Sequence, residues 1–127
     1  MPINSRGVIV NPLAEYTGIA YDFRRYNCWH HVIKVREDNG IDTPEFDCTK
    51  PELSDSVFIQ GHCDTKGMQQ INAPESLCAV LMCIDGRWHS GVYFDGMVSH
   101  CDMHARQVRL DSLESLKRLS ERVEFWL

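Results

Sequence analysis

The fold is decided by residues 77–101, which read Leu-Cys-Ala-Val-Leu-Met-Cys-Ile-Asp-Gly-Arg-Trp-His-Ser-Gly-Val-Tyr-Phe-Asp-Gly-Met-Val-Ser-His-Cys. Two Asp-Gly dipeptides, at 85–86 and 95–96, separate three runs rich in apolar residues. Asp-Gly between such runs is typical of a tight β-hairpin turn, because both residues tolerate the left-handed backbone that this turn needs. The pattern predicts three consecutive antiparallel strands over 77–84, 88–94 and 97–101.

Shorter elements are expected after this meander. Residues 108–110 are typical of a fourth short strand. Asp111 and Glu114 have the spacing of a capping box and predict the start of a helix in which leucine recurs every three residues. Residues 123–127 are expected to form a closing strand.

The clearest helix lies before the meander. Cys28, Val32 and Val35 recur at i, i+4 and i+7, which is the period of a helix with one apolar face. Asn27 is expected to cap its N-terminus. Asn39-Gly40 is suited to a left-handed C-terminal cap and predicts the end of the helix.

Two further short helices are expected, over 12–17 and within 52–60. Helices followed by an antiparallel meander favour the α+β class. A chain of 127 residues with 43% apolar residues fits one core. We therefore expect a single domain over 1–127.

The composition excludes several kinds of function. Thirteen Lys and Arg stand against 18 Asp and Glu, and the formal net charge of −5 argues against general binding of nucleic acid. No apolar run is long enough to span a bilayer. The N-terminus, Met-Pro-Ile-Asn-Ser-Arg, lacks the charged and apolar regions of a signal peptide.

Six cysteines allow three interpretations: a disulfide framework, a metal site, or thiols of which one is reactive. The absence of a signal peptide disfavours disulfides, and the absence of a Cys-x2-Cys pair disfavours structural zinc. We expect mostly buried thiols, with Cys78 and Cys83 inside an apolar run, and neither a metal nor a cofactor. The cysteines are Cys28, Cys48, Cys63, Cys78, Cys83 and Cys101.

One cysteine is placed for nucleophilic catalysis. Cys28 falls in the first turn of a predicted helix, where unpaired N–H groups and the helix dipole stabilise a thiolate. His89 lies on a predicted strand and could act as the base that such a nucleophile needs. His100 follows across the second hairpin, where strand pairing would bring it close enough to orient His89.

Two motifs in this order resemble the NlpC/P60 cysteine peptidases, especially their short phage-tail members. Residues 26–35, Tyr-Asn-Cys-Trp-His-His-Val-Ile-Lys-Val, are similar to the nucleophile helix of that family. Residues 89–100 are similar to its His-x-Gly-(Ile/Val)-Tyr hairpin, which ends in a second His. The resemblance implies a papain-like α+β fold, with the nucleophile helix packed on an antiparallel sheet, and hydrolysis of cell-wall stem peptides.

The resemblance also implies roles for individual residues. Cys28 would be the nucleophile, His89 the general base and His100 the group that orients it. Tyr21, with the backbone N–H of Cys28, would stabilise the oxyanion, and Tyr16 and Tyr26 are alternatives for that role.

The residues around Cys28 depart from the family pattern. Asn27 stands where the family usually has Asp, and His30 stands where it has a small residue, so His30 would narrow the cleft or contact substrate. Trp29 could line the cleft, but we expect it in the core. We expect His31 on the solvent face of the helix, and His62 and His104 in loops.

The implied substrate is a peptidoglycan stem peptide, and the implied partners are other phage tail proteins. The chain would belong to the virion, act in the bacterial cell wall or periplasm, and be made in the host cytoplasm without a signal peptide. It would neither bind nucleic acid nor insert into a membrane. A second hypothesis is a structural tail-tip or hub subunit with weak or no activity, and a third is a zinc-binding module.

Overall fold

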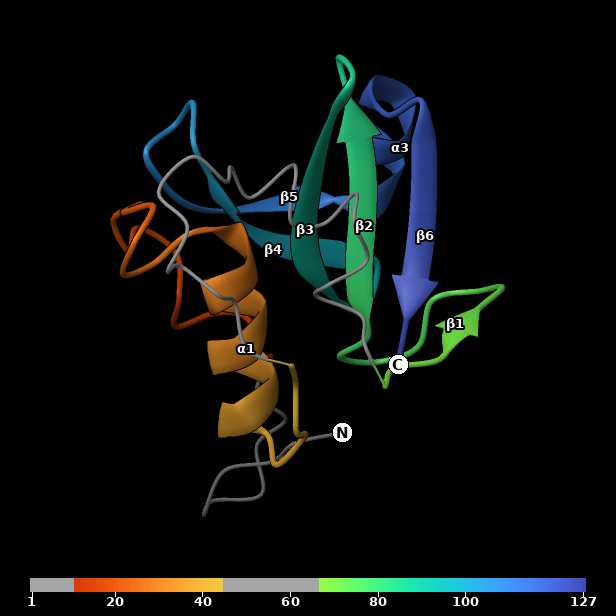
Figure 1. The fold of residues 1–127 in the computed structure, drawn as a ribbon, viewed down its shortest axis with the longest axis horizontal. Helices are drawn as coiled ribbons and strands as arrows, with labels where there is room; N and C mark the ends of the chain where they lie inside the picture. Colours follow the sequence, from red (N-terminus) through yellow and green to blue (C-terminus); the bar gives the residue numbers. More distant parts are fainter. Residues whose placement is uncertain (1–10, 45–66) are drawn as a thin grey trace.

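The computed structural model describes residues 11–44 and 67–127, and the elements named here lie within them (Figure 1). The described part is α+β, as the sequence predicts, with a six-stranded antiparallel sheet and two helices. The elements in chain order are α1 (Cys28–Asp38), β1 (Gln70–Ile71), β2 (Ala79–Ile84), β3 (Arg87–Phe94), β4 (Met97–Asp102), β5 (Gln107–Ser112), α3 (Leu113–Leu119) and β6 (Arg122–Trp126).

The two predicted hairpin turns are confirmed. β2 and β3 are joined by Asp85 and Gly86, whose φ values are 51° and 75°. β3 and β4 are joined by Asp95 and Gly96, at 49° and 82°. Positive φ at both central residues is the geometry of the two-residue turn that Asp-Gly favours. The meander then continues into β5, and β6 returns to pair with β2 on its other side.

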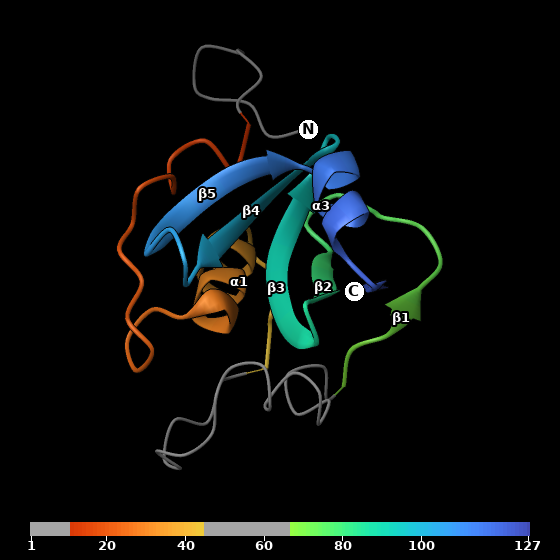
Figure 2. The same ribbon diagram turned by 90° about the horizontal axis from the view of Figure 1, so that it is seen from above.

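The two helices pack on opposite faces of the sheet (Figure 2). α1 packs against β3 and β4, and its core cluster contains Cys28, Val32, Val92 and Cys101. α3 packs on the other face, where Leu116 belongs to a second cluster. Because successive side chains of a strand point to opposite faces, β2, β3 and β4 each place side chains in or against both clusters.

β3 and β4 pair along only part of their lengths. Their register runs from Phe94–Met97 to Val92–Ser99. β3 then continues beside β2, and β4 continues beside β5, so that the two hairpins diverge (Figure 1). Gly91 lies at the point of divergence, where an added Cβ would be 2.6 Å from Cγ1 of Val98. Glycine therefore allows the two strands to approach closely there.

The predicted helix near Cys28 is confirmed, including both ends. α1 begins after Asn27, whose side chain accepts hydrogen bonds from the backbone N–H groups of Trp29 and His30 at 3.0 Å. It ends at Asp38, before Asn39 and a left-handed Gly40. Neither described helix is long and apolar enough to cross a membrane.

Some elements differ from the predicted ones. Residues 12–17 form turns and not a helix: the Ala14 amide donates to the Asn11 carbonyl three residues earlier, and the next segment is held by β5, where the Gly18 amide donates to the Val108 carbonyl. The strand expected from 77 begins at Ala79, because Leu77 takes a positive φ of 66°. The two-residue β1 was not expected. The helix predicted within 52–60 lies outside the described residues.

Candidate functional site

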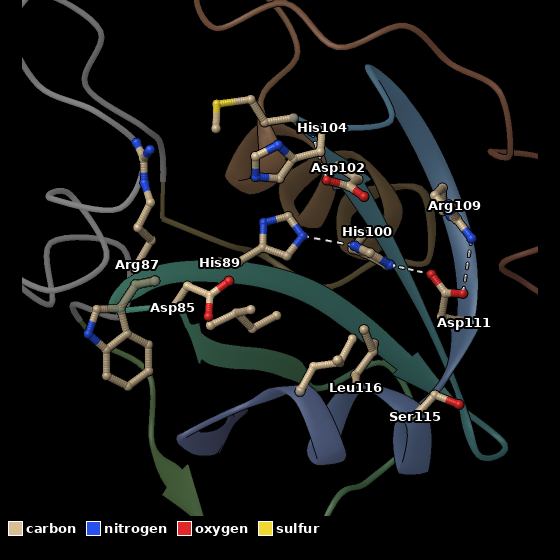
Figure 3. A pocket seen from close by; sticks show the side chains of 14 residues that line it. Asp85, Arg87, His89, His100, Asp102, His104, Arg109, Asp111, Ser115 and Leu116 are labelled. Carbon is tan, nitrogen blue, oxygen red and sulfur yellow. Dashed lines mark hydrogen bonds and ion pairs between the residues drawn. The ribbon is translucent and has the colours of Figure 1, made fainter.

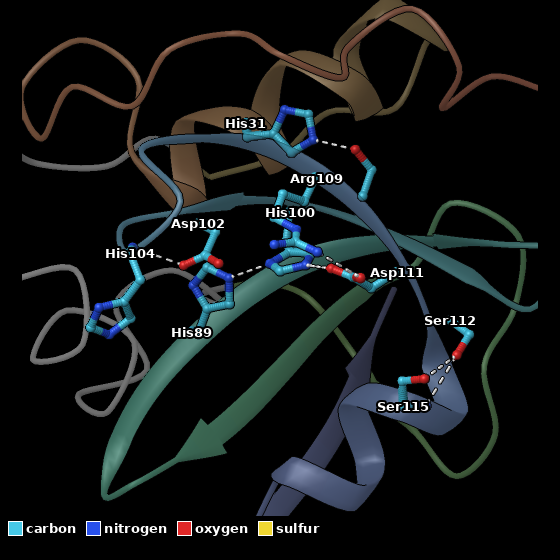
Figure 4. Close-up of polar contacts among 10 residues, drawn as sticks. His31, His89, His100, Asp102, His104, Arg109, Asp111, Ser112 and Ser115 are labelled. Atoms are coloured by element: carbon cyan, nitrogen blue, oxygen red, sulfur yellow. Dashed lines mark hydrogen bonds and ion pairs between the residues drawn. The ribbon is translucent and has the colours of Figure 1, made fainter.

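Three side chains on neighbouring strands form a continuous hydrogen-bonded chain. Nε2 of His89 on β3 lies 2.8 Å from Nδ1 of His100 on β4. Nε2 of His100 lies 2.8 Å from a carboxylate oxygen of Asp111 on β5 (Figure 4). The predicted contact between His89 and His100 is confirmed. It spans the gap where β3 and β4 diverge, because His100 lies one position beyond the last paired residue, Ser99.

The chain of hydrogen bonds assigns a tautomer to each imidazole. The Asp111 carboxylate can only accept, so Nε2 of His100 carries the hydrogen. Nδ1 of a neutral His100 is then an acceptor, and Nε2 of His89 donates to it. The lone pair of His89 is left on Nδ1, on the side of the ring away from His100 (Figure 3). Nδ1 of His89 is thus the basic nitrogen of the group.

The three residues line a cavity of about 360 Å³ (Figure 3). His89, His100 and Asp111 form part of its polar wall, and Ile84, Leu116 and other apolar side chains form the rest. The pKa of His89 is lowered to about 3, first by its burial and next by the neighbouring His100. At neutral pH His89 is therefore uncharged and able to accept a proton, and its lowered pKa makes it a weaker base than a free imidazole.

Asp111 was missed as a member of this group. The predicted capping box with Glu114 is wrong, because Ser112 is the N-cap of α3 and its side chain accepts from the Ser115 amide at 3.1 Å. Asp111 is the preceding residue and still belongs to β5, where it pairs with Val98. Asp111 and Ser112 can both cap a helix, so the sequence alone did not show at which of the two α3 begins. Because Ser112 is the cap, the Asp111 carboxylate is available to bind His100.

Cys28 is the first residue of α1, as predicted, and its exposed fraction is 0%. It lies in the cluster between α1 and the sheet. His89 pairs with Met82, and Met82 belongs to the cluster on the α3 side. The two groups are therefore directed from opposite faces of the sheet, and the described lining of the cavity includes His89 but not Cys28.

The first turn of α1 is nevertheless close enough to His89 to influence it. His31, one turn after Cys28, contributes to the lowering of the pKa of His89. α1 packs against both β3 and β4, the strands that carry His89 and His100. It lies on the face of the sheet opposite to those two side chains.

Asn27 and His30, the two departures from the family pattern, form one structural unit. While the Asn27 side chain caps the amide of His30, Nδ1 of His30 accepts from the Asn27 amide at 3.2 Å. This is a capping box in which His takes the place of the usual Glu or Gln. Burial lowers the pKa of His30, and this keeps the imidazole neutral so that Nδ1 can accept.

Trp29, Tyr21 and Tyr16 pack in the fold or bond to other residues near α1. Trp29 is fully buried, as expected, and its ring N–H donates to the Pro44 carbonyl at 2.7 Å. Tyr21 packs against the α1 cluster, and its backbone N–H donates to Arg106. Tyr16, a rival for the oxyanion role, donates its hydroxyl to Asp38 at 2.7 Å.

His31 was expected on the solvent face, and this expectation is wrong. Its exposed fraction is 0%, with Nδ1 2.6 Å from the Tyr26 hydroxyl and Nε2 2.7 Å from the Ser99 hydroxyl. The hydroxyl of Tyr26, the other oxyanion candidate, is thereby occupied. His104 lies in an exposed turn, as expected, and His62 is outside the described residues.

The thiols expected in the apolar run are confirmed. Cys78 and Cys83 are buried free thiols, and burial raises the pKa of each. Cys48 and Cys63 lie outside the described residues. Within residues 11–44 and 67–127, no group of three or more His, Cys, Asp or Glu side chains is arranged to hold a metal ion.

Comparisons with models of protein families, with curated proteins and with solved structures give no match to this chain.

Proposed function

We propose that this protein is a hydrolase that cleaves an amide bond by cysteine nucleophilic catalysis, with Cys28 as nucleophile and His89 as base. The observation that carries the proposal is the chain from His89 through His100 to Asp111, in which Nδ1 of His89 is the acceptor at the end of the chain. A neutral imidazole, oriented through its other nitrogen and placed at a cavity, is what general-base catalysis needs.

The proposed reaction has two stages. Nδ1 of His89 takes the thiol proton of Cys28, and the sulfur attacks the carbonyl carbon of the substrate amide. The oxyanion is stabilised by the backbone N–H of Cys28 and, as proposed from the family resemblance, by Tyr21. The protonated His89 donates its proton to the leaving amine as the C–N bond breaks. Water, deprotonated by His89, then hydrolyses the thioester, and Cys28 regains its proton.

Cys28 and His89 are directed from opposite faces of the sheet, so this reaction requires a movement that brings Sγ of Cys28 to Nδ1 of His89. The helix dipole of α1 stabilises the thiolate that forms, because Cys28 occupies the first helical position. The low pKa of His89 favours proton transfer during attack over a preformed thiolate–imidazolium pair.

The substrate and biological setting are proposed from the family resemblance. The substrate would be a peptidoglycan stem peptide, and the fold would be papain-like. The protein would be part of a phage tail, beside other tail proteins, and would act on the bacterial cell wall.

The test is a digest of defined muropeptides, with the products identified by mass spectrometry. We expect cleavage by the wild type and none by Cys28→Ala. Cys83→Ala is the matched control, since Cys83 is a buried thiol on β2 that has no role in the reaction. Equal turnover by Cys28→Ala and the wild type would exclude Cys28 as the nucleophile.

A structural tail-tip or hub subunit is the second candidate. The complete burial of Cys28, on the face opposite to His89, favours it. The two candidates differ in thiol chemistry, because an activated cysteine is alkylated well below the pH at which an ordinary thiol reacts. Alkylation of Cys28 with the pH dependence of an ordinary thiol, together with no cleavage of muropeptides, would support the structural role.

A further inference from the structure

We propose that Asp111 is a positioning residue that sets the direction of the hydrogen bonds between His89 and His100, and so decides which nitrogen of His89 is basic. The kinetic part of this inference rests on the proposed function. The structural part, which concerns tautomers, does not.

Two neutral histidines alone can share a hydrogen bond in either direction. In one direction Nε2 of His89 donates to Nδ1 of His100, and the lone pair of His89 is on Nδ1. In the other direction Nδ1 of His100 donates, and the hydrogen of His89 moves to Nδ1. Only the first arrangement leaves Nδ1 of His89 able to accept a proton.

The Asp111 carboxylate selects the first arrangement. It lies 2.8 Å from Nε2 of His100 and has no hydrogen to donate, so His100 must carry its hydrogen on Nε2. The exposed fraction of the His100 side chain is only 5%, and its opposite nitrogen contacts His89. Asp111 therefore acts on His89 through His100.

Asp111 is itself held in place. Its second oxygen lies 3.5 Å from a guanidinium nitrogen of Arg109, which is two residues earlier on β5 and on the same face. The exposed fraction of the Asp111 side chain is 28%, against 52% for Arg109. A partly buried carboxylate that contacts a histidine on one side and an arginine on the other is suited to fixing a tautomer.

The matched control is Asp102 on β4, which lines the same cavity (Figure 3). Its negative charge acts on His89, as the Asp111 charge would if charge alone mattered. Its carboxylate accepts from the His104 amide at 2.9 Å. Asp102→Asn thus removes a nearby charge and leaves the Asp111 carboxylate unchanged.

The experiment measures the ¹⁵N chemical shifts of the histidine rings at pH 7.5, where protonated and unprotonated ring nitrogens are well separated. In the wild type we expect His89 and His100 both to be protonated at Nε2 alone. Asp111→Leu should lose this single tautomer, whereas Asp111→Asn, whose side-chain oxygen can still accept, and Asp102→Asn should keep it. Asp111→Ala is measured in parallel. If Asp111→Leu does not fold, the tautomers of Asp111→Ala still test the inference.

Two results would overturn the inference: unchanged tautomers in Asp111→Leu and Asp111→Ala, or a wild-type His100 that is protonated on both nitrogens. In the muropeptide digest, Asp111→Leu should lower turnover at least about tenfold, with Asp111→Asn closer to the wild type. A wild type that cleaves nothing contradicts the proposed function, and the ring shifts still decide the role of Asp111.

Discussion

Nε2 of His31 on α1 lies 2.7 Å from the hydroxyl of Ser99 on β4, although the two residues are 68 positions apart in the chain. Both side chains are fully buried. The second ring nitrogen of His31 contacts the Tyr26 hydroxyl, which lies just before α1. This polar bridge between helix and sheet fixes the first turn of α1, and hence Cys28, relative to the strands that carry His89 and His100.

Ser99→Ala tests this bridge. It leaves a buried ring nitrogen of His31 without its partner, and such a loss costs about 1–3 kcal/mol of unfolding free energy. Urea unfolding of the two proteins measures the difference. The exposed Ser76→Ala is the control, with an expected change within about 0.5 kcal/mol. Equal effects of the two substitutions would show that the bridge does not stabilise the fold.

The burial of His31 also predicts a pH dependence of stability. Burial, with His100 and Lys34 as lesser causes, lowers the pKa of His31 to about 3 from the ordinary 6.5. Below pH 6.5 the unfolded chain binds a proton that the folded chain does not, so stability is lost as the pH falls toward 3. His31→Gln should reduce the slope of unfolding free energy between pH 6 and 4 by about 1.4 kcal/mol per pH unit.

The control for this slope is His104→Gln, because His104 lies in an exposed turn. Its slope should match that of the wild type. If His31→Gln also kept the wild-type slope, the neutral state of the buried His31 would not limit stability in acid.

The pH dependence of cleavage is a separate prediction. A base must be uncharged to accept a proton, and the pKa of His89 is lowered to about 3 by burial and by His100. We therefore expect kcat/KM to show no loss from His89 protonation between pH 7 and 5. An acid limb centred near pH 6.5 in the rate of muropeptide cleavage would contradict this assignment.

Gly91→Ala tests the close approach of β3 and β4. The new Cβ would lie 2.6 Å from Cγ1 of Val98 and 2.9 Å from the Ser99 carbonyl oxygen, so the strands must separate. Such overpacking costs about 1–3 kcal/mol. The contact between His89 and His100 should weaken with it, as a loss of the single tautomer in the ¹⁵N spectrum.

Ser90→Ala is the matched control at the neighbouring position. The Ser90 hydroxyl is buried and has no hydrogen-bond partner among residues 11–44 and 67–127, so its removal should be neutral or stabilising. A Gly91→Ala variant as stable as Ser90→Ala would show that the gap between the strands adapts without cost.

The meander could be predicted because its signals are local. Each Asp-Gly turn is specified by its own two residues, and α1 by the spacing of Cys28, Val32 and Val35. The contact of His89 with His100 could be predicted because the two residues lie on strands joined by a single hairpin turn. These features depend on few residues, all close together in the chain.

The features that could not be predicted depend on packing between distant segments or on a shift of one residue. His31 follows Cys28 by three positions, so it shares the apolar face of the helix, but only the fold supplies Ser99 and Tyr26 as partners for a buried imidazole. Asp111 and Ser112 are both good N-caps. The pairing of β5 with β4 extends through Ser112 and determines that Ser112, and not Asp111, caps α3. This strand register cannot be read from the neighbouring sequence.

The hydrogen-bonded chain has a regular spacing with a consequence for assembly. His89 and His100 are 11 residues apart, and so are His100 and Asp111, with one residue on each successive strand. Contacts across such short loops have a small entropic cost of closure and can form early in folding. Cys28 comes from much earlier in the chain, and it packs against the opposite face of the sheet when α1 docks. The hydrogen-bonded chain can therefore become ordered before α1 docks, and in the proposed reaction that docking would be the last step in assembling the site.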